Sequence, residues 1–445
     1  MGSLLTVTVK VNDEALRRRI STTLDDWHRD GFSLALVETA GGVHSPGPNG
    51  NSQADLYRPL RLPVVLIADS RLGGISSSIS AYESLLLRGY DVQSVLLFRD
   101  DYYQNHEYLQ GYFGKKEIPL RPLPAPPARP QDAARDAENM DNYYEGLTRG
   151  DEIRSLLDEM AVKHHARLDR LDSMPDRAHD LIWYPFTQHQ GMTPRDIGVI
   201  DSAYDDHFQM HSPQTESKLQ PAFDGSASWW TQGLGHGNPD LALSAAYAAG
   251  RYGHVMFAGN VHEPALQLAE RLLQTLGNPR LRKVFYTDNG STGMEVAVKM
   301  GLRAASARYG WDARREDVQI LGLKGSYHGD TMGVMDCSEP STFNRKVEWY
   351  RGRGFWFDFP QVTMAQGVWR VDMGDLGEAL GESTLQFASL QEVFDLEARR
   401  RSQTAQRYRD FIHRTVHEQT QQKGTKFGAL ILEPVILGAG GMLFW

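Results

Sequence analysis

The stretch Phe285-Tyr-Thr-Asp-Asn-Gly-Ser-Thr-Gly-Met-Glu-Val-Ala-Val-Lys299 is the most informative part of the chain. Its aromatic start, polar glycine turn and apolar residues at helical spacing predict a strand, a tight turn and a helix. Gly290 allows the turn, so the amides of Ser291 and Thr292 and the Ser291 hydroxyl are expected to face outward at the positive end of the helix. This arrangement suits a phosphate, although an ordinary Ser/Thr-capped helix gives the same pattern.

Strand and helix patterns alternate on both sides of this motif. The predicted strands span residues 283–287, 318–323 and 429–435, and the predicted helices span residues 264–276 and 293–309. Strands that alternate with helices predict an α/β layer structure.

Two further motifs in this half carry residues that suit a cofactor. Leu323-Lys-Gly-Ser-Tyr-His-Gly-Asp330 predicts a strand that leads into the pair Tyr327 and His328. The Tyr327 ring can stack on a heteroaromatic ring, although most aromatic residues in turns serve packing. Glu433 stands at the carboxyl end of a predicted buried strand, where ligands of open α/β sheets bind.

The first part of the chain also has the pattern of an open α/β sheet. The predicted strands span residues 33–38, 62–68 and 92–98, and the predicted helices span residues 14–27 and 79–87. Six prolines between residues 118 and 130 stiffen the chain and predict a boundary. The charged residues that follow, from 132 to 171, favour helices.

Length and composition restrict the class of protein. A chain of 445 residues exceeds a single ordinary core, so at least two domains are expected. The net charge of -9 and the lack of a basic, aromatic stripe argue against nucleic acid as a partner. The sequence contains no run of about 18 apolar residues, so no membrane span is predicted. The single cysteine, Cys337, excludes an intrachain disulfide and is expected to be a small buried apolar residue.

Three motif-like patterns give weak support to other chemistry. His207 and His211 have a spacing found in zinc sites, but no Glu follows His207 and no third ligand is evident. The glycines of Gly233-x-Gly-x-Gly237 follow no predicted strand, which argues against a dinucleotide fingerprint. No G-x-S-x-G motif supports a serine hydrolase.

The cofactor motifs together resemble the class III aminotransferases, which are pyridoxal-phosphate enzymes of fold type I. The diaminopelargonate branch is resembled by Trp183-Tyr-Pro-Phe-Thr-Gln188, Asp224-Gly-Ser-Ala-Ser-Trp-Trp230, Gly233-Leu-Gly-His-Gly-Asn-Pro239 and Trp349-Tyr-Arg-Gly-Arg-Gly-Phe355. This resemblance covers residues 181–445.

The resemblance implies a role for individual residues. The implied cofactor-binding residues are Gly290, Ser291, Thr292, Tyr327, His328 and Glu433. The first three would hold the cofactor phosphate, the tyrosine would stack on the pyridine ring, and the glutamate would support the polar edge of the ring. Phe186, Trp229 and Trp230 would form the wall of the pocket for the aliphatic amino-ketone.

A second resemblance covers the start of the chain. Leu36-Val-Glu-Thr-Ala-Gly-Gly-Val-His-Ser-Pro46 and Leu62-Pro-Val-Val-Leu-Ile-Ala-Asp-Ser-Arg-Leu-Gly-Gly74 resemble dethiobiotin synthetase in the form that is fused to this aminotransferase. By this resemblance Glu38 binds magnesium, and the amides of Gly41 and Gly42 approach the substrate. ATP and Mg²⁺ are then the expected cofactors of this half.

The two resemblances divide the chain into three parts. Residues 1–115 are expected to be the carboxy-terminal part of a P-loop-type synthetase domain, residues 116–175 a linker with helices, and residues 176–445 the amino-terminal part of the aminotransferase domain. The phosphate loop G-x-x-x-x-G-K-[ST], the cofactor-binding lysine and the aspartate that pairs with the pyridine nitrogen are not found. Both halves are therefore expected to be truncated and inactive alone.

The implied function is two consecutive steps of biotin synthesis. The expected substrates are S-adenosylmethionine, 8-amino-7-oxononanoate and 7,8-diaminononanoate, and a homodimer is expected. The family resemblance favours a mitochondrial location, while the sequence itself carries no readable signal and leaves a cytoplasmic one open.

Two alternatives stay open at this point. One is a non-catalytic relative, such as a dimer partner of a longer subunit. The other is another class III enzyme, of the ornithine or GABA type, which the Trp229-Trp230 pair and the synthetase resemblance disfavour.

Overall fold

The computed structural model describes residues 12–185, 187–212, 219–255, 257–312 and 314–445. The chain forms two compact units, an amino-terminal unit of residues Met1–Met256 and a carboxy-terminal unit of residues Phe257–Trp445. The domain boundaries expected from the sequence stay a prediction. No helix in the described ranges is long and apolar enough to cross a membrane.

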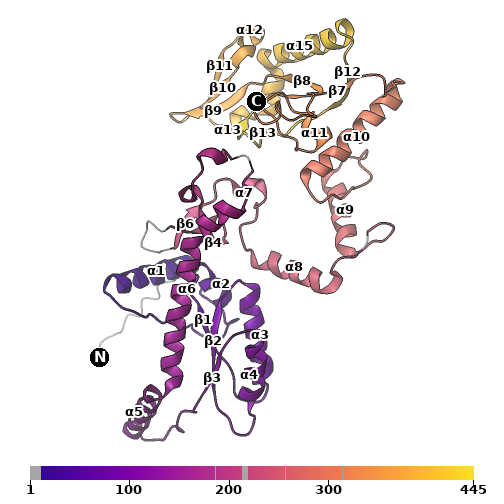
Figure 1. The fold of residues 1–445 in the computed structure, drawn as a ribbon. Coiled ribbons are helices and arrows are strands. Elements are labelled where there is room, and N and C mark those ends of the chain that lie inside the picture. Colours follow the sequence, from indigo (N-terminus) through magenta and orange to yellow (C-terminus); the bar gives the residue numbers. More distant parts are fainter. Residues whose placement is uncertain (1–11, 186, 213–218, 256, 313) are drawn as a thin grey trace. The chain divides into compact units, whose positions relative to one another are not determined.

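The amino-terminal unit contains a parallel sheet, a small antiparallel sheet and several helices (Figure 1). Its longer helices are α1 (Asp13–Arg29), α3 (Gly74–Leu87), α4 (Asn105–Gly114), α5 (Ala133–Arg149), α6 (Asp151–Leu181) and α8 (Pro239–Tyr252). Its short helices are α2 (Gln53–Tyr57), η1 (Arg58–Leu60), η2 (His189–Gly191), η3 (Pro194–Asp196) and α7 (Ala227–Trp230). Its strands are β1 (Val64–Ile67), β2 (Val92–Phe98), β3 (Leu120–Leu123), β4 (Val199–Tyr204), β5 (His207–His211) and β6 (Leu219–Phe223).

The parallel sheet has the order β1-β2-β3, and the first two strands confirm the predictions for residues 62–68 and 92–98. Helices α3 and α4 cover one face of this sheet and α6 lies on the other (Figure 1). The core between the sheet and α3 and α4 includes Leu66, Tyr82, Val95, Leu97, Leu109 and Phe113. Leu66, Tyr82, Val95 and Leu97 lie in the predicted strands and helix, whereas Leu109 and Phe113 lie in α4, which was not predicted.

Two predictions for this unit are wrong. Residues 33–38 form no strand, and Leu34 and Leu36 are exposed, because no described strand pairs with them. The proline-rich segment was expected only to break regular structure, but it contains β3. Pro122 is tolerated there because β3 lies at the edge of the sheet, where a missing amide donor leaves no central ladder broken.

The carboxy-terminal unit is a second α/β structure. Its helices are α9 (Glu263–Leu276), α10 (Gly290–Tyr309), α11 (Met332–Met335), η4 (Gly374–Leu376), α12 (Gly377–Leu380), α13 (Leu390–Val393), α14 (Leu396–Arg401), α15 (Gln403–His417) and η5 (Glu418–Gln422). Its strands are β7 (Val318–Leu323), β8 (Gly354–Phe357), β9 (Gln361–Ala365), β10 (Val368–Asp372), β11 (Thr384–Phe387), β12 (Lys426–Leu430), β13 (Ile436–Leu437) and β14 (Met442–Leu443).

The main sheet of this unit is parallel and has the order β12-β7-β8. The predicted strand β7 and helices α9 and α10 are confirmed. Residues 283–287 form no strand in the structure, and the strand predicted at 429–435 ends at Leu430. The Ile431 amide still donates to Leu321, and the strand cannot continue through Pro434, which has no amide donor, and Val435, which has a positive φ of 70°.

A small antiparallel sheet with the order β11-β10-β9 lies in the chain between β8 and β12. It has its own core, in which Val371, Leu380 and Val393 are fully buried. The sequence interpretation did not foresee this lobe, whose strands are short.

The parts of the amino-terminal unit are joined by a buried charge cluster at Asp201 on β4. The Asp201 carboxylate accepts 2.7 Å from Arg61 Nε and 2.8 Å from Arg167 Nη2, and its side chain is only 3% exposed. Arg61 lies just before β1 and also donates to Asp91, which precedes β2, at 3.0 Å. Burial alone raises the pKa of Asp201, but the two arginines outweigh it and lower the pKa. This cluster links the parallel sheet, α6 and the small sheet β4-β5-β6.

We expect Asp201→Ala to lower the free energy of unfolding of the amino-terminal unit by about 3 kcal/mol, because two largely buried arginines lose their common partner. Native-state hydrogen exchange of the β1 and β4 amides measures this loss. Glu145→Ala on α5 is the control, since it removes only an exposed pair with Arg149 and should change stability by less than about 1 kcal/mol. A loss below about 1 kcal/mol for Asp201→Ala would contradict the role of the cluster.

Candidate functional site

The amino terminus of α10 lies at the turn that the sequence singled out. Asn289 caps this helix, and its Oδ1 accepts from the Thr292 amide at 2.9 Å and from the Thr292 hydroxyl at 3.2 Å. The expectation that the Thr292 amide faces outward is therefore wrong, because the asparagine side chain takes this donor. The sequence analysis overlooked Asn289, although an Asn directly before a predicted helix is a strong capping signal.

The amides of Gly290 and Ser291 have no acceptor among the described residues. A side chain at Gly290 would meet nothing within 4 Å, so the space beside Gly290 is open. The first amides of a helix carry partial positive charge and need an acceptor. The two amides left here therefore fit a phosphate group, and the Ser291 hydroxyl, which also bonds with Tyr327, lies beside them.

The loop after β7 brings Tyr327 to this helix end. Gly329, at a φ of 128°, packs so closely on α10 that a Cβ there would lie 2.5 Å from Ser291 Oγ. The Tyr327 hydroxyl donates to Asp330 Oδ2 at 2.8 Å, and the Ser291 hydroxyl also bonds with Tyr327. Burial and the Asp330 carboxylate raise the pKa of Tyr327 to about 12, so this phenol stays protonated. Tyr327 is 43% exposed.

Glu433 holds two loops together at the carboxyl end of the main sheet. Its Oε2 accepts from the Tyr327 amide at 3.2 Å, and its Oε1 accepts from the Gly438 amide at 3.0 Å. The carboxylate therefore fixes the backbone of Tyr327 in this structure. A direct role toward the pyridine ring stays a prediction.

His328 is buried beside Tyr327. Burial lowers the pKa of its imidazole, which favours the neutral form. Its Nε2 has no hydrogen-bond partner among the described residues. The structure thus places Gly290, Ser291, Tyr327 and His328 together in the carboxy-terminal unit.

The sequence analysis also missed Glu295, which lies one turn into α10. Its Oε2 accepts from the Thr331 hydroxyl at 2.6 Å and from the amides of Gly333 and Val334 at 3.1 and 3.0 Å. Glu295 thereby caps α11 and fixes the end of the Tyr327 loop. Cys337 follows α11 and is buried, as predicted, and burial raises the pKa of its thiol to about 11.

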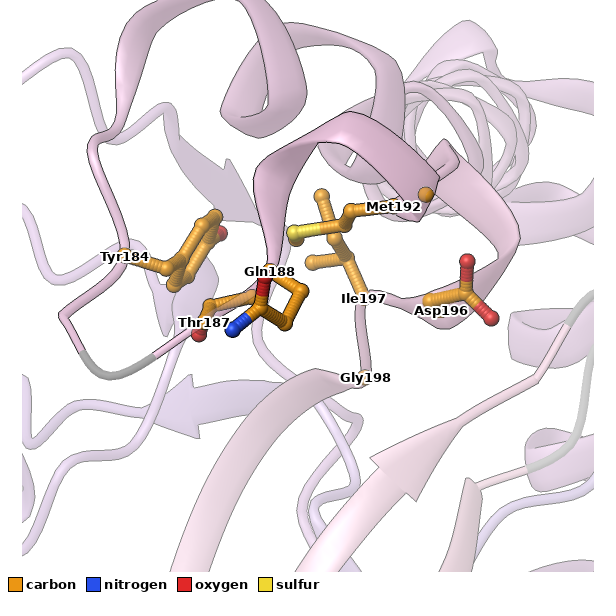
Figure 2. Close-up of a pocket in the computed structure, with 8 residues that line it drawn as sticks. Tyr184, Thr187, Gln188, Met192, Asp196, Ile197 and Gly198 are labelled. Atoms are coloured by element: carbon orange, nitrogen blue, oxygen red, sulfur yellow. The ribbon is translucent and has the colours of Figure 1, made fainter. Parts of the chain in front are cut away.

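The predicted substrate residues Trp229 and Trp230 lie in the amino-terminal unit, in the short helix α7, with exposed fractions of 68% and 63%. Phe186, the third predicted substrate residue, lies outside the described residues. A hollow lies close to it in the chain, and Figure 2 shows Tyr184 on one side and Asp196 on the other. It is lined by Tyr184, Thr187, Gln188, Gly191, Met192, Asp196, Ile197 and Gly198.

The predicted synthetase residues form an exposed loop. Glu38, Gly41 and Gly42 are exposed, and the Thr39 hydroxyl donates to the Gly41 carbonyl at 2.7 Å. No group of His, Cys, Asp or Glu side chains in the described part of the chain is arranged to hold a metal ion. The structure therefore shows no further ligand beside Glu38, and its magnesium role stays a prediction.

The disfavoured motifs have structural explanations. His207 and His211 lie on strand β5, and His211 Nε2 pairs with Asp172 Oδ1 at 2.7 Å, not with a metal ligand set. Gly235 and Gly237 allow close backbone packing, since a Cβ at Gly235 would lie 3.1 Å from the Cα of Asp205.

Known proteins resemble this chain along nearly its whole length. The model of the family described as aminotransferase class-III matches residues 220–352. A bifunctional dethiobiotin synthetase/adenosylmethionine-8-amino-7-oxononanoate aminotransferase from Emericella nidulans is 67% identical over 441 residues, which cover 97% of this chain and 56% of that protein. The chain is homologous to these bifunctional proteins.

A bifunctional dethiobiotin synthetase/7,8-diamino-pelargonic acid aminotransferase from Arabidopsis thaliana, named mitochondrial, is 40% identical over 424 residues, covering 92% of this chain and 49% of that protein. The chain thus spans about half the length of these bifunctional relatives. A crystal structure of a Bacillus anthracis aminotransferase gives a TM-score of 0.43 at 20% identity, covering 62% of this chain and 50% of that one. The family match includes Ser291 and Tyr327, but it ends before the lobe β9-β10-β11 and Glu433.

We expect Ser291→Asp to weaken the binding of pyridoxal phosphate at least about tenfold, because a carboxylate would face the phosphate at the helix amino terminus. Equilibrium dialysis with the 445-residue chain measures this affinity. Ser383→Asp, on an exposed residue of the same unit, adds the same charge elsewhere and should leave the affinity unchanged. Equal affinity in wild type and Ser291→Asp would rule out this phosphate site.

Glu295 should make the stability of the carboxy-terminal unit depend on acid pH. Burial raises the pKa of Glu295, but hydrogen bonds from Thr331, Lys299 and Val334 outweigh it and lower the pKa below its ordinary value of 4.5. A lowered folded-state pKa stabilises above the unfolded value, and this stabilisation is lost as the pH falls through the folded value.

Glu295→Gln should therefore melt at a lower temperature than wild type at pH 7, and the difference should shrink as the pH falls below 4.5. Thermal melts of both proteins across this range measure the difference. Glu378→Gln, at an exposed position in α12, is the control and should show no such trend. A difference that stays constant with pH would argue against an ionised capping carboxylate.

Proposed function

We propose that the protein acts in biotin synthesis as part of an enzyme that catalyses two consecutive steps. In the first, an amine passes from S-adenosylmethionine to 8-amino-7-oxononanoate with pyridoxal phosphate as cofactor. In the second, ATP and Mg²⁺ serve the conversion of 7,8-diaminononanoate to dethiobiotin. Homology to the bifunctional proteins over 97% of the chain supports both steps. The observation that carries the first is the open pair of amides at α10 beside the Tyr327 ring.

The residues of this site have distinct tasks in the proposal. Pyridoxal phosphate supplies the electron sink for amine transfer when it is bound. The amides of Gly290 and Ser291 and the Ser291 hydroxyl bind the phosphate, and this anchors the cofactor at one end. The Tyr327 ring covers one face of the pyridine, and Glu433 and Asp330 fix this tyrosine through its amide and its hydroxyl. Thr292 supports the helix cap. It does not contact the phosphate itself and acts only by holding the neighbouring Ser291 in place.

His328, in the same loop as Tyr327, is proposed to contact the cofactor as a neutral imidazole. Its burial favours this neutral form. Trp229 and Trp230, with Phe186, form the wall for the aliphatic chain of the substrate. Their large exposed rings in α7 support this role, because exposed tryptophans commonly mark contact surfaces.

The synthetase step is proposed to use the exposed loop of residues 38–42. Glu38 provides a carboxylate oxygen of the kind that Mg²⁺ prefers, and Gly41 and Gly42 let a substrate approach the backbone.

A homodimer and a mitochondrial location are proposed as well. Exposed apolar side chains on α9, such as Leu266 and Leu272, support an association surface, and the Arabidopsis relative is named mitochondrial.

We expect the protein encoded by the complete open reading frame to form 7,8-diaminononanoate from 8-amino-7-oxononanoate with S-adenosylmethionine as donor. With ATP, Mg²⁺ and bicarbonate it should also convert the diamine to dethiobiotin. Mass spectrometry of the products measures both steps. Ornithine and 4-aminobutyrate are the control donors and should give no product. Transfer from either control donor, or a lack of both products, would overturn the proposed function.

A further inference from the structure

The tryptophan pair stands on an unusual piece of backbone. Ala227, Ser228, Trp229 and Trp230 have φ values of 45°, 45°, 58° and 68°, so four successive residues with a Cβ lie in the left-handed region. This region is unfavourable for such residues, and they visit it mostly one at a time. Residues in this state persist only when the surrounding structure holds them there.

Asp224 supplies the contacts that hold this turn. Its Oδ1 accepts from the Ser226 hydroxyl at 2.9 Å, and its Oδ2 accepts from the Ser228 hydroxyl at 2.9 Å. The Asp224 carbonyl also accepts from the Ala227 amide at 3.1 Å. Asp224, which is buried, therefore bonds to Ser226 just before the left-handed stretch, to Ala227 at its start and to Ser228 within it.

The Asp224 carboxylate is itself fixed from behind by His236. His236 Nε2 lies 2.8 Å from Asp224 Oδ2, and both side chains are buried. The backbone of His236 is held in turn by a two-way bridge to Asp205, with N–O distances of 2.7 and 3.1 Å. The His236 ring also packs on Phe208 of β5, at 4.9 Å between ring centroids. The carboxylate is thus anchored to the small sheet.

We infer that Asp224 is a positioning residue, whose carboxylate holds residues 227–230 in the left-handed conformation and so sets the direction in which Trp229 and Trp230 face the substrate. The substrate part of this inference rests on the proposed function. Although burial tends to raise the pKa of Asp224, the hydrogen bonds from His236, Ser226 and Ser228 lower it to about 2. The group is therefore an ionised acceptor at neutral pH, which strengthens each of these bonds.

The turn contains its own reporters. The amide of Trp230 donates to the Ser226 carbonyl at 3.1 Å, and the amides of Thr231 and Gln232 donate to the Ala227 carbonyl at 3.0 and 3.1 Å. These bonds exist only while the left-handed turn is formed. Their hydrogen exchange therefore measures the conformation without any ligand.

Asp224→Asn in the 445-residue chain should speed exchange of these three amides about tenfold or more, because charge-assisted hydrogen bonds become weaker neutral ones. Ser228→Ala removes one of the bonds and should give a smaller increase. The Ala68 amide, which donates to Leu96 in the parallel sheet, reports the fold of the unit and should be unchanged. Asp240→Asn, an exposed carboxylate at the start of α8, is the control for loss of charge.

A glycine substitution separates positioning from general support. Ala227→Gly relieves the left-handed strain at one residue, so in the Asp224→Asn background it should recover most of the lost protection. A carboxylate that only supports the surrounding fold would gain nothing from this change. The four variants are Asp224→Asn, Ser228→Ala, Asp240→Asn and the double variant Asp224→Asn/Ala227→Gly. Their affinity for 8-amino-7-oxononanoate, measured by calorimetry, should fall in the order in which their amide exchange becomes faster.

Unchanged exchange in Asp224→Asn, or no recovery with Ala227→Gly, would overturn the inference. Exchange that changes as expected in a chain where the affinity for 8-amino-7-oxononanoate does not follow would overturn the substrate part of it. A wild-type chain that shows the exchange pattern but binds no 8-amino-7-oxononanoate would support the clamp and count against the proposed function. The two failures are thereby distinct.

Discussion

A carboxylate that leaves water must receive donors in return, and this constraint fixes loops in each of the two units. Glu433 and Glu295 take backbone amides on both sides of the Tyr327 loop, and Asp224 takes two hydroxyls and an imidazole below the tryptophan pair. Asp201 does the same with two arginines. Glu295, Glu433 and Asp201 each accept from at least one segment far away in sequence, so each of these carboxylates fixes a loop or helix against another part of its unit.

The α10 amino terminus shows the opposite imbalance, because there donors lack an acceptor. Asn289 satisfies one amide, but those of Gly290 and Ser291 have no acceptor among the described residues. An anion is the ligand that completes this set, and an aromatic ring next to it selects anions that carry a flat heterocycle. The oxygens of the nearby Glu433 and Glu295 carboxylates already accept protein donors. The specificity of the site thus follows from which groups are satisfied internally and which are not.

Local patterns predicted the features that depend on local sequence, and they failed where long-range pairing decides. The turn and helix after Phe285 and the parallel strands followed from periodicity and glycine placement. Residues 33–38 have a strand pattern yet find no partner strand, and a strand exists only through its neighbours. The lobe β9-β10-β11 has strands of four and five residues, too short for a clear period. The Asp224 clamp requires contacts across 12 residues to His236, which no local pattern encodes.

The Asp201 cluster lies at one end of the parallel sheet of the amino-terminal unit. Arg61 and Asp91 precede β1 and β2, so the cluster meets the parallel sheet at the amino ends of its strands. Ligands of open parallel sheets bind beyond the carboxyl ends, where Asp69 follows β1. The small sheet β4-β5-β6 is therefore attached at the end of the parallel sheet that ligands do not use. The tryptophan turn is therefore anchored at the end of the parallel sheet that lies opposite the carboxyl ends of its strands.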